Sequence, residues 1–157
     1  MSDRARVGYP RMKNRGVYFF AHVLVPVAIG ASIYVGWRST DILVFDWIDA
    51  IGGSDLIVRP KTELPFWVLY ALPDGLWVYA YTSWMLLIWR RPSLWVWSGL
   101  ILAVGAEVGQ LMGFVSGTYS LLDVAFYVGG FCLSRVLYAQ ATFVDTGYVN
   151  DGSSGLR

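Results

Sequence analysis

The sequence predicts an all-α integral membrane protein, a bundle of four transmembrane helices. Of its 157 residues, 56% are apolar and 15% are charged, whereas a soluble domain is about half apolar and about one quarter charged. The apolar residues gather into four long runs, and about 20 such residues span the hydrocarbon of a bilayer. The 17% share of aromatic residues argues against disorder. We therefore expect residues 1–157 to form a single membrane domain.

The charge balance and the reactive side chains exclude several function classes. Twelve basic and eleven acidic residues give a net charge of +1, so there is no basic excess for nucleic-acid binding. Cys132 is the only cysteine and His22 the only histidine, which rules out a disulfide framework and the usual zinc ligand sets. The sequence also lacks a phosphate-binding Gly-rich loop and a nucleophile elbow. We expect no metal, no cofactor and no nucleic-acid partner.

The first predicted helix covers residues 18–37, a run without a formally charged residue. It follows a tail, residues 1–16, that contains basic residues. The run is long enough to span a membrane and is not followed by a small-x-small cleavage site, which favours a retained anchor over a cleaved signal peptide. Pro26 lies inside it, and membrane helices tolerate such a kink.

The loop between the first two helices contains a second pattern. Within residues 42–51, apolar residues recur at a helical period with acids between them. This pattern is typical of an interfacial amphipathic helix, and the alternative is an irregular loop.

The second predicted helix covers residues 66–89 and includes the segment Pro73-Asp74-Gly75. Such a segment is a turn or helix-start signature. It predicts a break near 73–75, with Pro73 opening the true helix. The alternative is one kinked helix that begins at Phe66.

The third and fourth helices are predicted at residues 94–115 and 121–137, followed by a tail at 138–157. The fourth has about 17 residues, or roughly 25 Å, so it spans only if flanking aromatic residues lie in the interfaces. Four spans place nine of the twelve basic residues on one side. Positive segments stay cytoplasmic, which predicts a bacterial inner-membrane protein with both termini in the cytoplasm.

Polar residues in the hydrophobic runs indicate where function lies, since each is costly in lipid. Glu107 and Gln110 are three residues apart and share one helix face, and Asp74 and Asp123 lie near the same, outer end of two other helices. The binding residues expected in this outer half of the bundle are Asp74, Trp77, Glu107, Gln110, Asp123 and Tyr127. The alternative is that Asp74 and Asp123 only cap helices, an explanation that does not extend to the mid-helix Glu107.

Glycines at a spacing of four predict close helix packing. Gly105, Gly109, Gly113 and Gly117 form such a ladder on the third helix. Its expected partner is the fourth helix, where Gly130 belongs to a stripe of small and polar residues. His22 is more typical of a hydrogen-bonded or interfacial residue than of a proton relay.

Part of the chain, mainly residues 94–137, resembles the VanZ-like membrane proteins. The resemblance rests on Glu107-x-x-Gln110, a short loop at Gly117-Thr118, Asp123, and Gly130 seven residues later. Tyr127 stands where the family pattern has an Asn. Members are small bacterial multi-helix proteins named after an accessory protein of glycopeptide resistance that lowers sensitivity to teicoplanin. The resemblance implies a role in the cell envelope but no particular reaction.

Two function classes follow from these patterns. The first and preferred is a non-enzymatic envelope protein that binds a lipid, a lipid-linked precursor or a partner protein through the polar cluster. The second is a membrane enzyme acting on a lipid or lipid-linked substrate, with Glu107 as general acid or base and Asp74 or Asp123 as its partner. Either function requires the cluster to surround a cavity, whereas a structural network would have its members in mutual contact.

Overall fold

The computed structural model describes residues 14–37, 50, 60, 62–89 and 93–150, the last seven of these by their backbone alone. Within these residues the secondary structure is helical, without a strand. The helices are α1 (Arg15–Phe19), the π-helix η1 (Phe20–Leu24), α2 (Val25–Trp37), α4 (Phe66–Ile88), α5 (Leu94–Leu111) and α6 (Leu121–Asn150). The predicted interfacial helix at 42–51 lies outside the described residues, apart from Ala50.

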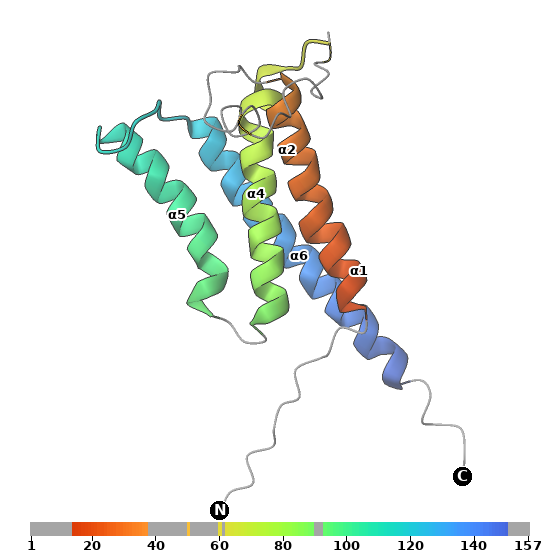
Figure 1. The fold of residues 1–157 in the computed structure, drawn as a ribbon. Coiled ribbons are helices and arrows are strands. Elements are labelled where there is room, and N and C mark those ends of the chain that lie inside the picture. Colours follow the sequence, from red (N-terminus) through yellow and green to blue (C-terminus); the bar gives the residue numbers. More distant parts are fainter. Residues whose placement is uncertain (1–13, 38–49, 51–59, 61, 90–92, 151–157) are drawn as a thin grey trace, which may run out of the picture.

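The helices form four rods that run in alternating directions (Figure 1). α1, η1 and α2 make one continuous rod, Arg15–Trp37. We call the end where α5 ends and α6 begins the Ser120 end, and the opposite end, where α4 ends and α5 begins, the Ser93 end. The stacked rings of Trp89 and Trp95 close the Ser93 end between α4 and α5.

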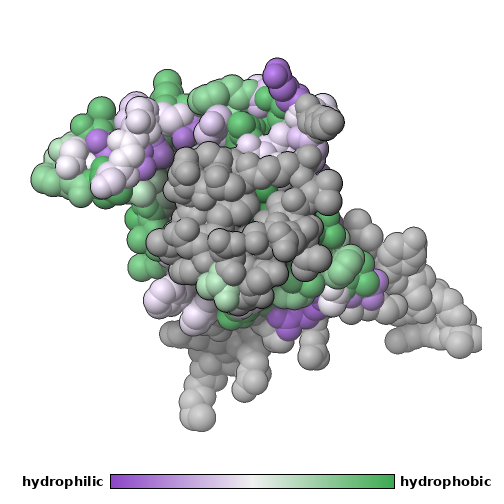
Figure 2. All heavy atoms as spheres, turned by 45° about the horizontal axis from the view of Figure 1, so that its top comes forward, coloured by the Kyte–Doolittle hydropathy of each residue, from purple (hydrophilic) through white to green (hydrophobic). Residues whose placement is uncertain are grey.

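Three of the rods are long and apolar enough to cross a membrane: Arg15–Trp37, Leu94–Leu111 and Leu121–Phe143. Large apolar side chains are exposed along them, with Leu102 72% and Phe20 62% accessible. Apolar side chains also cover much of the coloured surface in Figure 2. Because such exposure is unfavourable in water and natural in lipid, the helices indicate a membrane-embedded protein.

α4 is the central rod, since it contacts α2, α5 and α6. Ala71, Val78, Thr82 and Ser83 are among its buried residues. A helix enclosed by its neighbours can carry small and polar residues that a lipid-facing helix cannot. The buried Thr82 and Ser83 of α4 fit this enclosed position.

The predicted break near 73–75 is wrong, because α4 is one helix from Phe66 to Ile88 with Pro73 inside it. Successive residues of a helix point about 100° apart, and these three residues face three neighbours. The backbone of Pro73 lies against Gly30 of α2, and Gly75 lies against Phe126 of α6. Asp74 faces a cavity beside α5. Packing against α2 and α6 therefore holds a segment whose local signature is a turn in a continuous helix.

The first rod contains a π-helical turn just before Pro26. The backbone N–H of Val25 donates to the carbonyl of Phe20, five residues earlier. Proline has no N–H to give to the carbonyl four residues before it, and local π geometry is one way in which membrane helices satisfy the freed groups. The π turn thus follows from the proline that the sequence places inside the span.

The third helix ends at Leu111 rather than at residue 115. Gly113 has a φ of +76°, the left-handed conformation that commonly ends helices. The N–H of Phe114 then donates to the carbonyl of Gly109 at 2.8 Å. Gly113 and Gly117 are consequently loop residues, and a Cβ on Gly105 would meet nothing within 4 Å in this chain.

The predicted packing of the glycine ladder against the fourth helix is therefore wrong, and a Cβ on Gly109 would instead lie 2.7 Å from Val115 of the following loop. Gly130 does pack closely against another helix. Its partner is α4, not α5: a Cβ on Gly130 would collide with the carbonyl oxygen of Gly75. A Cβ on Gly75 would in turn lie 2.9 Å from the carbonyl oxygen of Phe126. The two glycines let the backbones of α4 and α6 meet.

The fourth helix continues past residue 137 to Asn150, so the predicted tail at 138–157 begins as helix. The sequence from 138 to 146 has neither Gly nor Pro to end it. Thr142 Oγ1 donates to the carbonyls of Tyr138 and Ala139, which satisfies its hydroxyl within the helix. Tyr138 also packs edge-on against Tyr18 of α1.

Candidate functional site

A polar cavity of about 600 Å³ lies at the Ser120 end of the bundle. Its wall comes from α4, α5, α6 and the loop that joins the last two. The residues that line it are Phe66, Tyr70, Asp74, Glu107, Gln110, Thr118, Tyr119, Ser120, Asp123 and Tyr127.

Helix periodicity places these side chains on one cavity. Phe66, Tyr70 and Asp74 follow one another at a spacing of four and so share a face of α4. Glu107 and Gln110 share a face of α5, as the sequence predicted. Asp74, Glu107, Gln110, Asp123 and Tyr127 all line the same cavity, so five of the six predicted binding residues are brought together around open space.

Glu107 is the most enclosed member of this set, with 4% of its surface exposed. Its Oε2 accepts a hydrogen bond from the backbone N–H of Ser120 at 2.9 Å. The Ser120 hydroxyl oxygen accepts from the N–H of Asp123 at 3.3 Å. Ser120 therefore caps the start of α6 and joins it to the carboxylate of α5.

Asp74 and Tyr127 connect α4 to α6 across the cavity. The Tyr127 hydroxyl lies within hydrogen-bonding reach of the Asp74 carboxylate, and its surroundings include the charges of Glu107 and Asp123. Tyr127 thus links α6 to Asp74 of α4.

Gln110 forms the part of the wall next to the loop. Its side chain packs against Gly117, whose φ is +139° and where a Cβ would lie 2.7 Å from Nε2 of Gln110. The Gln110 Oε1 atom is buried and has no hydrogen-bond partner among the described residues. An unpaired buried acceptor is costly, so a hydrogen-bond donor placed next to Gln110 Oε1 would be stabilising.

Trp77 has to be removed from the predicted site. Its side chain is 46% exposed, and its ring nitrogen lies beside Gly30 of α2. Trp77 follows Pro73 by four residues, and both residues lie against Gly30 of α2. The same period could have identified Phe66 and Tyr70, which precede Asp74 by eight and four residues.

The cavity wall combines three carboxylates with four aromatic rings. No Lys, Arg or His is among its lining residues, so the described part of the wall is acidic. Within the described residues, no group of three or more His, Cys, Asp or Glu side chains is arranged to hold a metal ion. The three carboxylates therefore surround the space rather than converge on a single point.

A second polar cluster lies nearer the Ser93 end. His22 Nδ1 is hydrogen-bonded to the Tyr79 hydroxyl, and its ring stacks on Tyr18 with centroids 4.1 Å apart. Ser83 and Ser134, both fully buried, are hydrogen-bonded at 2.8 Å. These pairs join α4 to the first rod and to α6, which is what interhelical hydrogen bonds do in membrane bundles.

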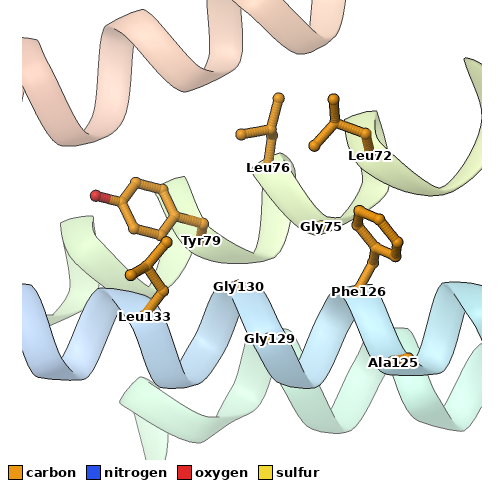
Figure 3. A pocket seen from close by; sticks show the side chains of 9 residues that line it. All are labelled: Leu72, Gly75, Leu76, Tyr79, Ala125, Phe126, Gly129, Gly130 and Leu133. Atoms are coloured by element: carbon orange, nitrogen blue, oxygen red, sulfur yellow. The ribbon is translucent and has the colours of Figure 1, made fainter. Parts of the chain in front are cut away.

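An apolar groove of about 640 Å³ runs between α4 and α6, lined by residues such as Leu72, Leu76, Phe126 and Leu133 (Figure 3). On α4 its residues lie on the face opposite to those that line the polar cavity, and the two have no lining residue in common. The groove and the cavity are therefore separate features.

The chain matches no protein-family model, no curated protein and no solved structure. The case for its function accordingly rests on its own residues and geometry.

Proposed function

We propose that this chain is a VanZ-like protein of the bacterial inner membrane that binds a lipid or a lipid-linked precursor of the cell envelope in the polar cavity. In this proposal α4 is the fourth span, both termini are cytoplasmic, and the cavity lies in the outer half of the bundle. A partner membrane protein is the alternative ligand. The basic residues outside the four rods support this orientation.

The observation that carries the proposal is the buried carboxylate of Glu107 facing open space. An ionisable side chain within a membrane helix is expensive and is a functional site by default. A purely structural network would bring the acids and amides into contact with one another. Here Asp74, Glu107 and Asp123 instead surround about 600 Å³, a volume typical of ligand pockets.

The first test is genetic and measures lipid-linked cell-wall precursors by mass spectrometry in a strain that lacks the gene. We expect a precursor pool to rise on deletion and to return to normal with the native protein. Glu107→Gln removes the charge but keeps the shape, and it should leave the pool raised. Glu63→Gln is the matched control, because Glu63 is exposed and lies outside the cavity lining, and it should restore the pool.

Membrane abundance of each variant must be measured alongside the pools. Unchanged pools together with loss of Glu107→Gln from the membrane would identify the carboxylates as a structural network and end the proposal. A precursor of altered mass, present with the native protein and absent with Glu107→Gln, would instead favour the second class, a membrane enzyme that uses the paired carboxylates in acid–base chemistry.

A further inference from the structure

A cation lies within the last of the candidate membrane spans. Arg135 belongs to the part of α6, Leu121–Phe143, that is long and apolar enough to cross a membrane. Its side chain is exposed, and the nearby Leu133 and Val136 each have 52% of their surface accessible. Arg135 therefore lies on a surface that is otherwise apolar, where an uncompensated charge is expensive.

The guanidinium of Arg135 is held over two aromatic rings. Its Cζ atom lies 5.4 Å from the ring centroid of Trp97 on α5, and 5.7 Å from that of Phe131, one turn earlier on α6. The two rings pack together with centroids 4.6 Å apart, and Phe131 is buried. Guanidinium groups stack on ring faces in this way, so the packing of α5 against α6 fixes where the charge lies.

The depth of this arrangement follows from α5. Trp97 is the fourth residue of α5, which begins at Leu94, and three residues rise about 4.5 Å along a helix. Arg135 therefore lies about one helical turn from the Ser93 end, where Trp89 and Trp95 are stacked. Tryptophan is enriched at the level of the lipid headgroups. The guanidinium is thus close to the lipid phosphates of one leaflet, at the end of the bundle opposite to the polar cavity.

The described part of the protein supplies no counter-charge for Arg135. Within it, the guanidinium interacts with the two rings and with no carboxylate. Arg15 at the same end differs, because its guanidinium donates to the carbonyl of Leu87. A guanidinium stacked on ring faces presents its N–H donors at its edge, in the fork geometry that matches a phosphate. The complement of Arg135 is therefore an anion with several oxygen acceptors.

We propose that Arg135 and Trp97 form a binding site for an anionic phospholipid at the Ser93 end, with the guanidinium bound to the lipid phosphate. Basic sites between membrane helices bind anionic headgroups. The exposed apolar side chains of Leu133 and Val136 suit acyl chains, which favours a lipid over a free phosphate ion. A zwitterionic lipid carries its own ammonium beside the phosphate, so a lipid with a net negative charge gains more from Arg135. This site goes beyond the proposed function and does not depend on it.

The test uses the purified full-length protein in detergent, with lipid binding followed by native mass spectrometry. Dioleoyl phosphatidylglycerol and dioleoyl phosphatidylcholine have the same acyl chains and differ in net charge. We expect the glycerol lipid to bind at least roughly tenfold more tightly, the difference that about 1.4 kcal/mol produces. Arg135→Gln should remove this preference. Arg15→Gln is the matched control, because it removes the same charge at the same end from a guanidinium already bound to a carbonyl, and it should retain the preference.

Trp97→Leu tests the site from the other helix, and it replaces Arg135→Gln if that variant does not fold, as judged by circular dichroism and elution volume. It keeps an apolar side chain but removes a ring beneath the guanidinium. The preference should fall roughly twofold to fivefold, the effect of an exposed cation–π contact.

Three results would overturn the inference. The first is equal binding of the two lipids to the native protein, or a preference that survives Arg135→Gln. The second is an equal loss of preference in Arg15→Gln, which would show a general attraction to basic residues at this end. The third is release of the glycerol lipid by inorganic phosphate at concentrations near the lipid's own Kd, which would assign the guanidinium to a soluble anion.

Discussion

At the scale of single residues, Gly75 and Gly130 stabilise the contact between α4 and α6, whereas the burial of Glu107 is unfavourable. Gly130 and Gly75 allow two backbones to meet, and their value lies in the absence of a side chain. Glu107 is a large polar side chain enclosed at 4% exposure. The two glycines contribute to stability through packing, whereas Glu107 is costly to bury, and this cost is the basis of the proposed function.

Gly130 provides a sharp test of the α4–α6 crossing. Gly130→Ala would put a methyl group against the carbonyl oxygen of Gly75, and neither backbone can move cheaply. We expect a loss of about 1–3 kcal/mol, the usual cost of overpacking, measured as a lower midpoint of denaturant unfolding in detergent.

The neighbouring glycine is the control for this substitution. A Cβ on Gly129 would meet nothing within 4 Å, so Gly129→Ala should be neutral or stabilising by up to about 1 kcal/mol through helix propensity. Equal destabilisation by both substitutions would show that the crossing does not depend on close approach at Gly130.

At the scale of helices, Pro26 and the π turn before it determine which way the first part of the rod faces. A π turn accommodates one extra residue, so it rotates the residues before it by about 100° relative to a regular helix. His22 lies within this turn and reaches the Tyr79 hydroxyl of α4. The contact between the two helices at this level thus depends on the proline.

This dependence can be measured as a coupling between two substitutions. In the native protein, Tyr79→Phe should cost about 1 kcal/mol for the lost hydrogen bond. In a Pro26→Ala background, where a regular helix turns His22 away, the same change should cost close to nothing.

Tyr81→Phe is the matched control for that coupling. The Tyr81 hydroxyl is hydrogen-bonded at 2.7 Å to Ser98, which belongs to α5 and not to the first rod, so the cost of Tyr81→Phe should be the same in both backgrounds. If the cost of Tyr79→Phe does not depend on Pro26, the proline does not direct His22.

The helices themselves could largely be predicted from the sequence, but their ends and partners could not. Apolar runs determine where a membrane helix must exist, so the starts of α5 and α6 agree with the sequence, and the start of α4 agrees with the alternative of one helix from Phe66. Pro73-Asp74-Gly75 misled because its local preference for a turn is outweighed by packing against α2 and α6, which only the folded bundle supplies. Gly113 was wrongly predicted to lie on a packing surface of the third helix. The spacing of four does not distinguish a glycine that ends a helix from one that packs against a neighbouring helix.

The carboxylate cavity was more predictable than the packing. Asp74, Glu107 and Asp123 are polar exceptions in apolar runs, and alternating helix directions bring them to the same end. Tyr119 and Ser120 could not be found in this way, because loop residues have no period. Trp77 shows the limit of helix spacing, since a residue three positions from Asp74 on the same helix nevertheless lies beside Gly30 of α2.

At the scale of the whole molecule, the number of spans determines where the two ends of the chain lie. Three rods meet the requirement of length and hydropathy for crossing a membrane, and α4 lies among them as an enclosed fourth rod. If α4 also spans, the number is even, and the N- and C-terminal tails lie on the same side.

Reporter enzymes fused to the two ends of the chain distinguish an even number of spans from an odd number. We expect an enzyme tag that is active only in the cytoplasm to work at both the N-terminus and the C-terminus, as four spans and the basic tails require. A tag fused after residue 37 should be inactive. Activity at only one terminus would show an odd number of spans and place α4 outside the set of crossing helices.

The trio Pro73-Asp74-Gly75 also has a consequence for how the bundle assembles. Apolar helices in lipid offer each other nearly equivalent surfaces, and sliding or turning one against the next changes little in buried hydrocarbon. Here, turning α4 by a single residue would press a carboxylate against α6 where only a glycine fits and leave the cavity without Asp74. These three adjacent residues thereby select one rotation of α4 about its own axis, among the many that the burial of apolar surface alone would allow.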